Sequence, residues 1–82
     1  YQEYPMIVKI MSLQDGVKTI TDCLAIKIKS EKYNLLIMEN HAPLIGEIKG
    51  NIEITLKDKK MTFDNINGYY LNLENTFKLM LR

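Results

Sequence analysis

Alternation of apolar and polar side chains with a period of two is the feature that most constrains the fold of this chain. Side chains two residues apart return to the same face of a β-strand. Three segments follow this pattern, as strands do when one face packs on a core and the other meets solvent. Their predicted inward residues are Leu24, Ile26 and Ile28, then Ile52, Ile54 and Leu56, then Phe77, Leu79 and Leu81.

Two further segments, residues 6–11 and 33–38, are more uniformly apolar and are predicted to be strands partly covered on both faces. Residues that favour turns lie between the apolar runs. The predicted turns are Asp15-Gly16, Gly50-Asn51, residues 57–60 and Asn67-Gly68. No stretch shows sustained helical spacing with caps, so essentially no helix is expected. The sequence predicts one all-β domain over residues 1–82, an antiparallel β-sandwich or flattened barrel of about eight to ten short strands.

The charge balance argues against nucleic acid or an anionic membrane surface as a partner. Ten lysines, one arginine and ten acids are scattered through the chain for a net charge of +1, which gives no steering field for nucleic acid or anionic lipid. The local excess at residues 57–60 is interpreted as a solvated hairpin tip rather than a phosphate contact. No apolar run approaches the roughly 20 residues of a membrane-spanning helix. Cys23 is the single cysteine, which excludes an intrachain disulfide and is typical of a reducing compartment.

The residues of catalytic chemistry are sparse. His41 is the single histidine and cannot form a zinc site alone, since such sites need three or four ligands. Ser12 and Ser30 lack the Gly-x-Ser-x-Gly setting of a nucleophile elbow. No Gly-rich loop precedes a helix, so no phosphate cradle is predicted. Tyr69 and Tyr70 are adjacent and point to opposite faces of a strand, so they form no base-stacking platform. We therefore predict a non-catalytic protein that holds no metal and no cofactor.

The segment around His41 admits two interpretations. His41 and Ala42 come just before Pro43, whose ring rigidifies the loop. The simpler interpretation is a loop histidine hydrogen-bonded to nearby backbone. The alternative is a partner-binding loop of fixed shape, made of His41, Ala42, Pro43 and Leu44.

The same segment carries a family resemblance. Residues 40–45, Asn-His-Ala-Pro-Leu-Ile, closely resemble the Gly-His-Ala-Pro-Leu-Ile signature of the N-terminal domain of F-type ATPase epsilon subunits, called delta in mitochondria. Upstream, Leu35 and Ile37 fit the apolar positions of the family's Gly-Glu-Leu-Gly-Ile stretch. The resemblance spans roughly residues 24–82.

Three downstream segments agree with the family in order and spacing. Residues 48–54 look like its Lys-Pro-Gly turn and the next strand, residues 67–69 like its Gly-Gly and the strand after it, and residues 75–79 like its closing Asn-x-Val-Thr-Val strand. The resemblance implies a β-sandwich that binds the gamma subunit at the foot of the central stalk. It also implies a position near the membrane rotor ring, an indirect link to the alpha/beta catalytic head, and a cytoplasmic location peripheral to the cell membrane within a larger complex.

The sequence departs from the family at three places. Residues 33–37 lose both glycines of the family stretch, and neutral Asn34 replaces the acid that in typical members lies near the rotor ring, so ring docking through that acid is not expected. Lys49-Gly50 lacks the intervening proline. No C-terminal helical hairpin is expected in residues 1–82.

Three hypotheses remain open from the sequence. The first is a non-catalytic epsilon subunit in the rotor of an F-type ATP synthase or ATPase, with Met80 and Tyr69 or Tyr70 suited to an interface. The second is the same subunit in a divergent motor that is not coupled to a proton-carrying ring. The third is an unrelated β-sandwich binding module, such as a peptide or nucleotide binder, with recognition of an extended peptide along a strand edge as its mechanism.

Overall fold

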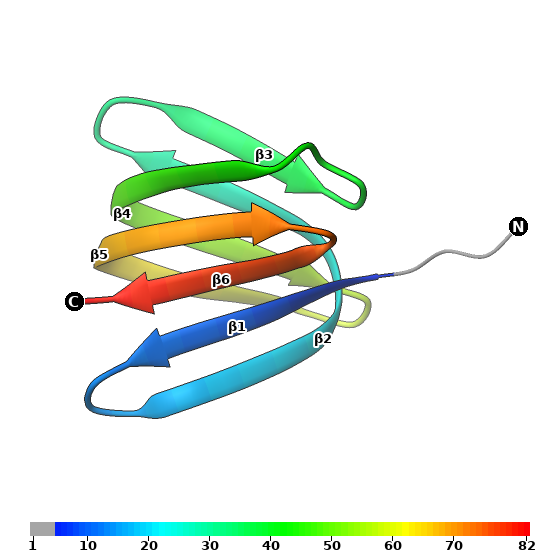
Figure 1. Cartoon of the computed structure of the whole chain (residues 1–82), viewed down its shortest axis with the longest axis horizontal. Helices are drawn as coiled ribbons and strands as arrows, with labels where there is room; N and C mark the ends of the chain where they lie inside the picture. The colour runs from blue at the N-terminus through cyan, green and yellow to red at the C-terminus, as the bar shows by residue number, and fades with distance from the viewer. Residues whose placement is uncertain (1–4) are drawn as a thin grey trace, which may run out of the picture.

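The alternating segments form six β-strands in the computed structural model, which describes residues 5–82 (Figure 1). The strands are β1 Met6–Ser12, β2 Gly16–Ser30, β3 Asn34–Met38, β4 Leu44–Leu56, β5 Lys60–Leu73 and β6 Thr76–Leu81. The described residues form no helix, and hence none long and apolar enough to cross a membrane. The predicted all-β class is confirmed.

The sheet closes on itself. Its strand order is β1-β6-β5-β4-β2-β3, and β1 pairs in addition with β2, which leaves β3 as an extra strand hydrogen-bonded to β2. One pairing departs from the predicted antiparallel arrangement, because β1 and β6 run parallel. These two strands are far apart in the sequence, so no hairpin forces them to be antiparallel. The result is the predicted flattened barrel, with mixed strand directions.

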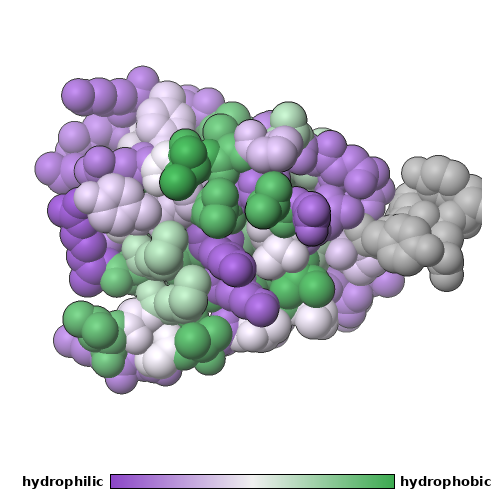
Figure 2. All heavy atoms as spheres, in the orientation of Figure 1, coloured by the Kyte–Doolittle hydropathy of each residue, from purple (hydrophilic) through white to green (hydrophobic). Residues whose placement is uncertain are grey.

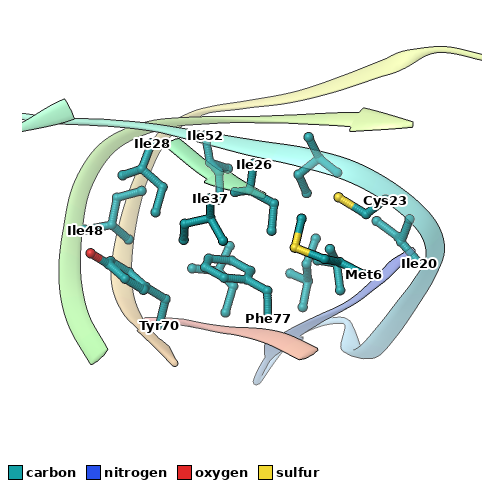
Figure 3. Packing of buried hydrophobic residues seen from close by; sticks show 14 residues of the cluster. Met6, Ile20, Cys23, Ile26, Ile28, Ile37, Ile48, Ile52, Tyr70 and Phe77 are labelled. Carbon is teal, nitrogen blue, oxygen red and sulfur yellow. The ribbon is translucent and has the colours of Figure 1, made fainter. Parts of the chain in front are cut away.

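Three long strands, β2, β4 and β5, curve from one layer of the barrel to the other (Figure 3). In β2 and β4 the pairing register shifts next to Cys23 and Gly50, and in β5 Asn65 has a positive φ of 54°. Bulges of this kind bend a strand and increase its twist. Each bent strand supplies a segment to both layers, so six strands replace the predicted eight to ten shorter ones.

Two predicted turns are confirmed and two are wrong. Asp15-Gly16 joins β1 to β2, and residues 57–59 join β4 to β5. Gly50-Asn51 lies inside β4 at its bend, where a Cβ on residue 50 would overlap the backbone carbonyl oxygen of Lys29. Asn67-Gly68 lies inside β5, and Gly68 permits a close approach to β6. Glycine is required at both positions, but for backbone proximity and not for chain reversal.

The core lies between the two layers and is built from the inward side chains of all six strands (Figure 3). Of the predicted inward residues, Ile26, Ile28, Ile52, Ile54, Phe77 and Leu79 are buried, and Leu56 and Leu81 are partly buried against them. The prediction that Leu24 points into the core is wrong, because its side chain is 41% exposed. The preceding Asp22 has a positive φ of 61°, and this irregularity turns Cys23 into the core in place of Leu24.

The outer faces of β1 and β3 are more exposed than predicted. Ile7 on β1 is 38% exposed, and Leu36 and Met38 on β3 are each 54% exposed. Both strands alternate buried and less buried residues, so each strand is covered on its inner face and less on its outer face, although its sequence is apolar on both. Apolar side chains therefore remain on the outside of the domain.

Candidate partner-binding surface

The loop that carries His41 connects β3 to β4 at one end of the barrel (Figure 1). Asn40 has a positive φ of 62°. Asparagine tolerates this left-handed conformation better than most residues. The backbone N–H of His41 donates to the Met38 carbonyl 3.2 Å away, and His41 Nδ1 lies 2.8 Å from the Ala42 carbonyl oxygen. The loop thus has a defined local shape.

A pair of asparagines fixes this loop to a second turn. The backbone N–H of Asn40 donates to Oδ1 of Asn75 at 2.5 Å, and Nδ2 of Asn75 donates to Oδ1 of Asn40 at 3.3 Å. Asn75 lies in the turn between β5 and β6, where it and Glu74 both have positive φ, 59° and 50°. The β3–β4 loop and the β5–β6 turn therefore form one connected end of the barrel.

Substitution of Asn40 tests this connection. Asn40→Ala is expected to destabilise the fold by about 1–3 kcal/mol, because alanine disfavours positive φ and lacks the side-chain oxygen that accepts from Asn75. Asn40→Gly relieves the backbone cost and loses only the side-chain hydrogen bond, about 0.5–1.5 kcal/mol. Urea unfolding followed by circular dichroism measures both. Equal stability of the two variants would contradict the left-handed conformation at this position.

The predicted partner-binding residues lie together in this loop and differ in exposure. Ala42 and Pro43 are exposed, whereas His41 and Leu44 are half-buried. The next residue, Ile45, is 76% exposed and was not among the predicted site residues. The exposure of Ile45 could not be predicted from the sequence, because it depends on which side of β4 faces outward.

Ile45 belongs to a larger surface, which we call the apolar face. It is the outer side of β1, β6, the second half of β5 and the first half of β4, where hydrophobic side chains gather (Figure 2). Pairing sets Met11 beside Met80 and Met80 beside Tyr69, and it sets Ile45 beside Leu71. The apolar face comprises Ile7, Met11, Ile45, Tyr69, Leu71, Leu73 and Met80.

Two tyrosines of β5 take different roles, which the sequence left undecided. Tyr69 is 44% exposed on the apolar face, where the Arg82 guanidinium lies 4.8 Å from its ring centroid and donates to its hydroxyl. Tyr70 is buried at 2% exposure and stacks on Phe77 with the ring centroids 5.6 Å apart. Of the three residues that the sequence suggested for an interface, Tyr69 and Met80 are exposed and Tyr70 is not.

The buried hydroxyl of Tyr70 joins the two layers. It lies 2.9 Å from the hydroxyl of Tyr33, which also donates to the Glu47 carbonyl oxygen at 2.5 Å. Burial, followed by the hydrogen bond and charge interaction with Tyr33, raises the pKa of Tyr70 above its ordinary value. This contact holds the start of β3 against β4 and β5, the strands that carry part of the apolar face.

The raised pKa of Tyr70 predicts a loss of stability in alkali. The unfolded chain loses the Tyr70 proton near pH 10, before the folded chain does, so this contribution is complete below about pH 10 and declines as the pH rises. Tyr70→Phe is expected to weaken the decline between about pH 10 and 12. The free energy of unfolding against pH measures the effect, with Tyr69→Phe as the control for general alkaline loss. An unchanged alkaline slope in Tyr70→Phe would contradict this assignment.

The fold and these surfaces define a small all-β domain with apolar side chains gathered on one outer face beside the β3–β4 loop. Within residues 5–82, no three side chains from His, Cys, Asp and Glu are grouped to hold a metal ion. Cys23 is buried, and burial raises the pKa of its thiol, which disfavours the reactive thiolate. The arrangement is suited to binding another macromolecule at the apolar face and the adjoining loop.

Comparison with known proteins gives a likeness of fold. The sequence matches no protein-family model, and no curated protein matches it. A solved structure of the central stalk and c-ring of the mitochondrial ATP synthase of Tetrahymena thermophila contains a similar chain. The TM-score is 0.74 at 15% sequence identity, and the match covers 99% of this chain. It covers 66% of the other chain, so this chain spans about two thirds of that protein's length.

Proposed function

We propose that this chain is a non-catalytic subunit of epsilon type in the rotor of an F-type ATP synthase or ATPase. The observation that carries the proposal is the agreement of two independent features. The signature-like residues 40–45 span the β3–β4 loop and the first two positions of β4, and the fold that presents them is similar to a chain in a structure of an ATP synthase central stalk. The contribution of such a subunit would be mechanical, since it would turn with the shaft and leave ATP hydrolysis to the head.

The proposed partner is the gamma subunit of the central stalk. It would contact His41, Ala42, Pro43 and Leu44 together with the apolar face, which continues from the loop through Ile45. Methionine and tyrosine, both present on this face, are enriched where proteins meet. The closed sheet resists bending, which suits a subunit that turns with a shaft. Contact with the alpha/beta head would be indirect, and the complex would lie at the cytoplasmic side of the cell membrane.

Asn34 favours a second version of this function. It lies exposed at the first position of β3, and its side chain is neutral. A divergent motor that lacks a proton-carrying ring would not need an acid there. The composition of the purified complex separates the two versions: ring subunits and proton pumping in the preparation would exclude the divergent motor.

An affinity tag on this chain tests the proposal in the native complex. The wild-type chain is expected to recover a gamma-type subunit and the ATP-hydrolysing head. Ile45→Asp is expected to reduce that recovery about tenfold or more, because a carboxylate would be buried against an apolar partner. Leu36→Asp is the matched control, since Leu36 is likewise exposed but lies on β3, outside the apolar face. Recovery of the wild-type chain only as a free monomer would refute the proposed function.

A further inference from the structure

Two lysines lie side by side in the middle of the apolar face. Lys9 on β1 is directly opposite Lys78 on β6 in the parallel pair. Both point outward, since their neighbours in each strand are buried in the core. Like charges directly opposite in a sheet are destabilising. The ion pairs within residues 5–82 are Lys49 with Glu31 and Lys60 with Glu53, so neither Lys9 nor Lys78 forms an ion pair with a carboxylate there.

The two lysines line a hollow on this face. It has a volume of about 240 Å³ and combines two cationic residues, one acidic residue and apolar walls. Its lining residues are Lys9, Leu71, Leu73, Glu74, Thr76 and Lys78. Hydrophilic side chains lie among the hydrophobic ones on the same side of the molecule (Figure 2). The hollow therefore offers one partner side chain both an apolar wall and a pair of ammonium groups.

We propose that this hollow receives a glutamate or aspartate side chain from the protein that covers the apolar face. The inference rests on the proposed function, which requires that the face be covered. Covering it would remove Lys9 and Lys78 from water, and an uncompensated buried charge is costly. A carboxylate placed between the two ammonium groups would neutralise their mutual repulsion and accept hydrogen bonds from both. The partner is thus an apolar surface with an acidic residue at its centre.

A second copy of this chain does not satisfy these requirements. A two-fold contact centred on the hollow would bring four ammonium groups together with only two Glu74 carboxylates, because the same patch meets itself in such a dimer. Besides Glu74, the nearest outward acid by pairing is Glu47, which lies on β4 next to Tyr69, at the margin of the apolar face. The charge pattern therefore favours a different chain as the occupant.

Zero-length carbodiimide crosslinking of the tagged native complex tests the inference, because this reagent joins amines only to carboxylates in direct contact. Mass spectrometry is expected to find Lys9 or Lys78 linked to a Glu or Asp of another subunit. Lys78→Glu is expected to reduce recovery of that subunit about tenfold or more, since it sets like charges together. Lys29→Glu, at an exposed position on β2 opposite the neutral Asn34 and Asn51 and outside the apolar face, is expected to change recovery less than twofold.

The outcomes distinguish this inference from the proposed function. If the partner is recovered, but neither lysine is crosslinked to it and Lys78→Glu leaves recovery unchanged, the inference is refuted and the proposed function stands. If the wild-type chain recovers no partner, both are refuted. Crosslinks from the lysines to a second copy of this chain would refute the inference. So would Lys78-dependent binding to phosphatidylglycerol vesicles without a crosslinked subunit.

Discussion

Phe77→Ala is expected to lower the free energy of unfolding by about 3–5 kcal/mol, a large part of the stability of a domain this small. Phe77 is fully buried in β6 and stacks on Tyr70 at the centre of the core (Figure 3). Its removal loses apolar burial and leaves a cavity that two layers of strands cannot readily collapse. Urea unfolding measures the loss.

Phe63→Ala provides the matched comparison. Phe63 lies in β5 and is only partly buried against the core, so the same truncation is expected to cost less. Equal losses for the two variants, or a loss below about 1 kcal/mol for Phe77→Ala, would contradict the central position of Phe77.

Gly68→Ala is expected to destabilise the domain by about 1–3 kcal/mol, although it adds a single methyl group. A Cβ at this position would overlap the backbone carbonyl oxygen of Met80 on the neighbouring strand β6. Backbone cannot move aside as a flexible side chain can, so β5 and β6 must separate locally. Because both strands carry the apolar face, the variant is also expected to weaken recovery of the partner.

Gly16→Asn is the control for glycine replacement in general. A Cβ at position 16 meets no atom within 4 Å, and asparagine tolerates the positive φ of 74° found there. Gly16→Asn is expected to change the free energy of unfolding by no more than about 0.5 kcal/mol. Thermal unfolding of both variants separates the two effects, and a neutral Gly68→Ala would show that the two strands do not approach as closely as described.

The fold class and most of the core could be predicted because half-buried strands leave a period-two pattern in the sequence. Ile26, Ile28 and Phe77 follow it without interruption. Leu24 does not, because the left-handed backbone at Asp22 shifts the alternation at that point. Such a bulge leaves no mark in the hydrophobic pattern, so its position could not be predicted.

Glycines were identified correctly as special positions but were assigned the wrong role. Gly50 and Gly68 were both predicted in turns, and both lie inside long strands. Glycine is found at chain reversals, at bends and at close backbone contacts. The sequence does not distinguish these uses when the contacting atom belongs to a residue distant in the chain, as with Lys29 and Met80.

The candidate site could be predicted in part. Residues 41–44 were singled out through Pro43 and the resemblance, and the structure places them together in the β3–β4 loop and at the first position of β4. The apolar face was missed, because it depends on the pairing of β1 with β6 and of β4 with β5. Alternation also could not decide whether Tyr69 or Tyr70 faces outward. Long-range register supplies this information, and a single sequence does not contain it.

The most direct test of the proposed rotor role is a cryo-EM structure of the complex purified through a tag on this chain. We predict that a gamma-type subunit lies against residues 39–45 and the apolar face, with the barrel intact and no ligand in a catalytic arrangement. A complex in which these residues face solvent while another surface holds the partner, or a preparation that contains the free chain alone, would contradict it.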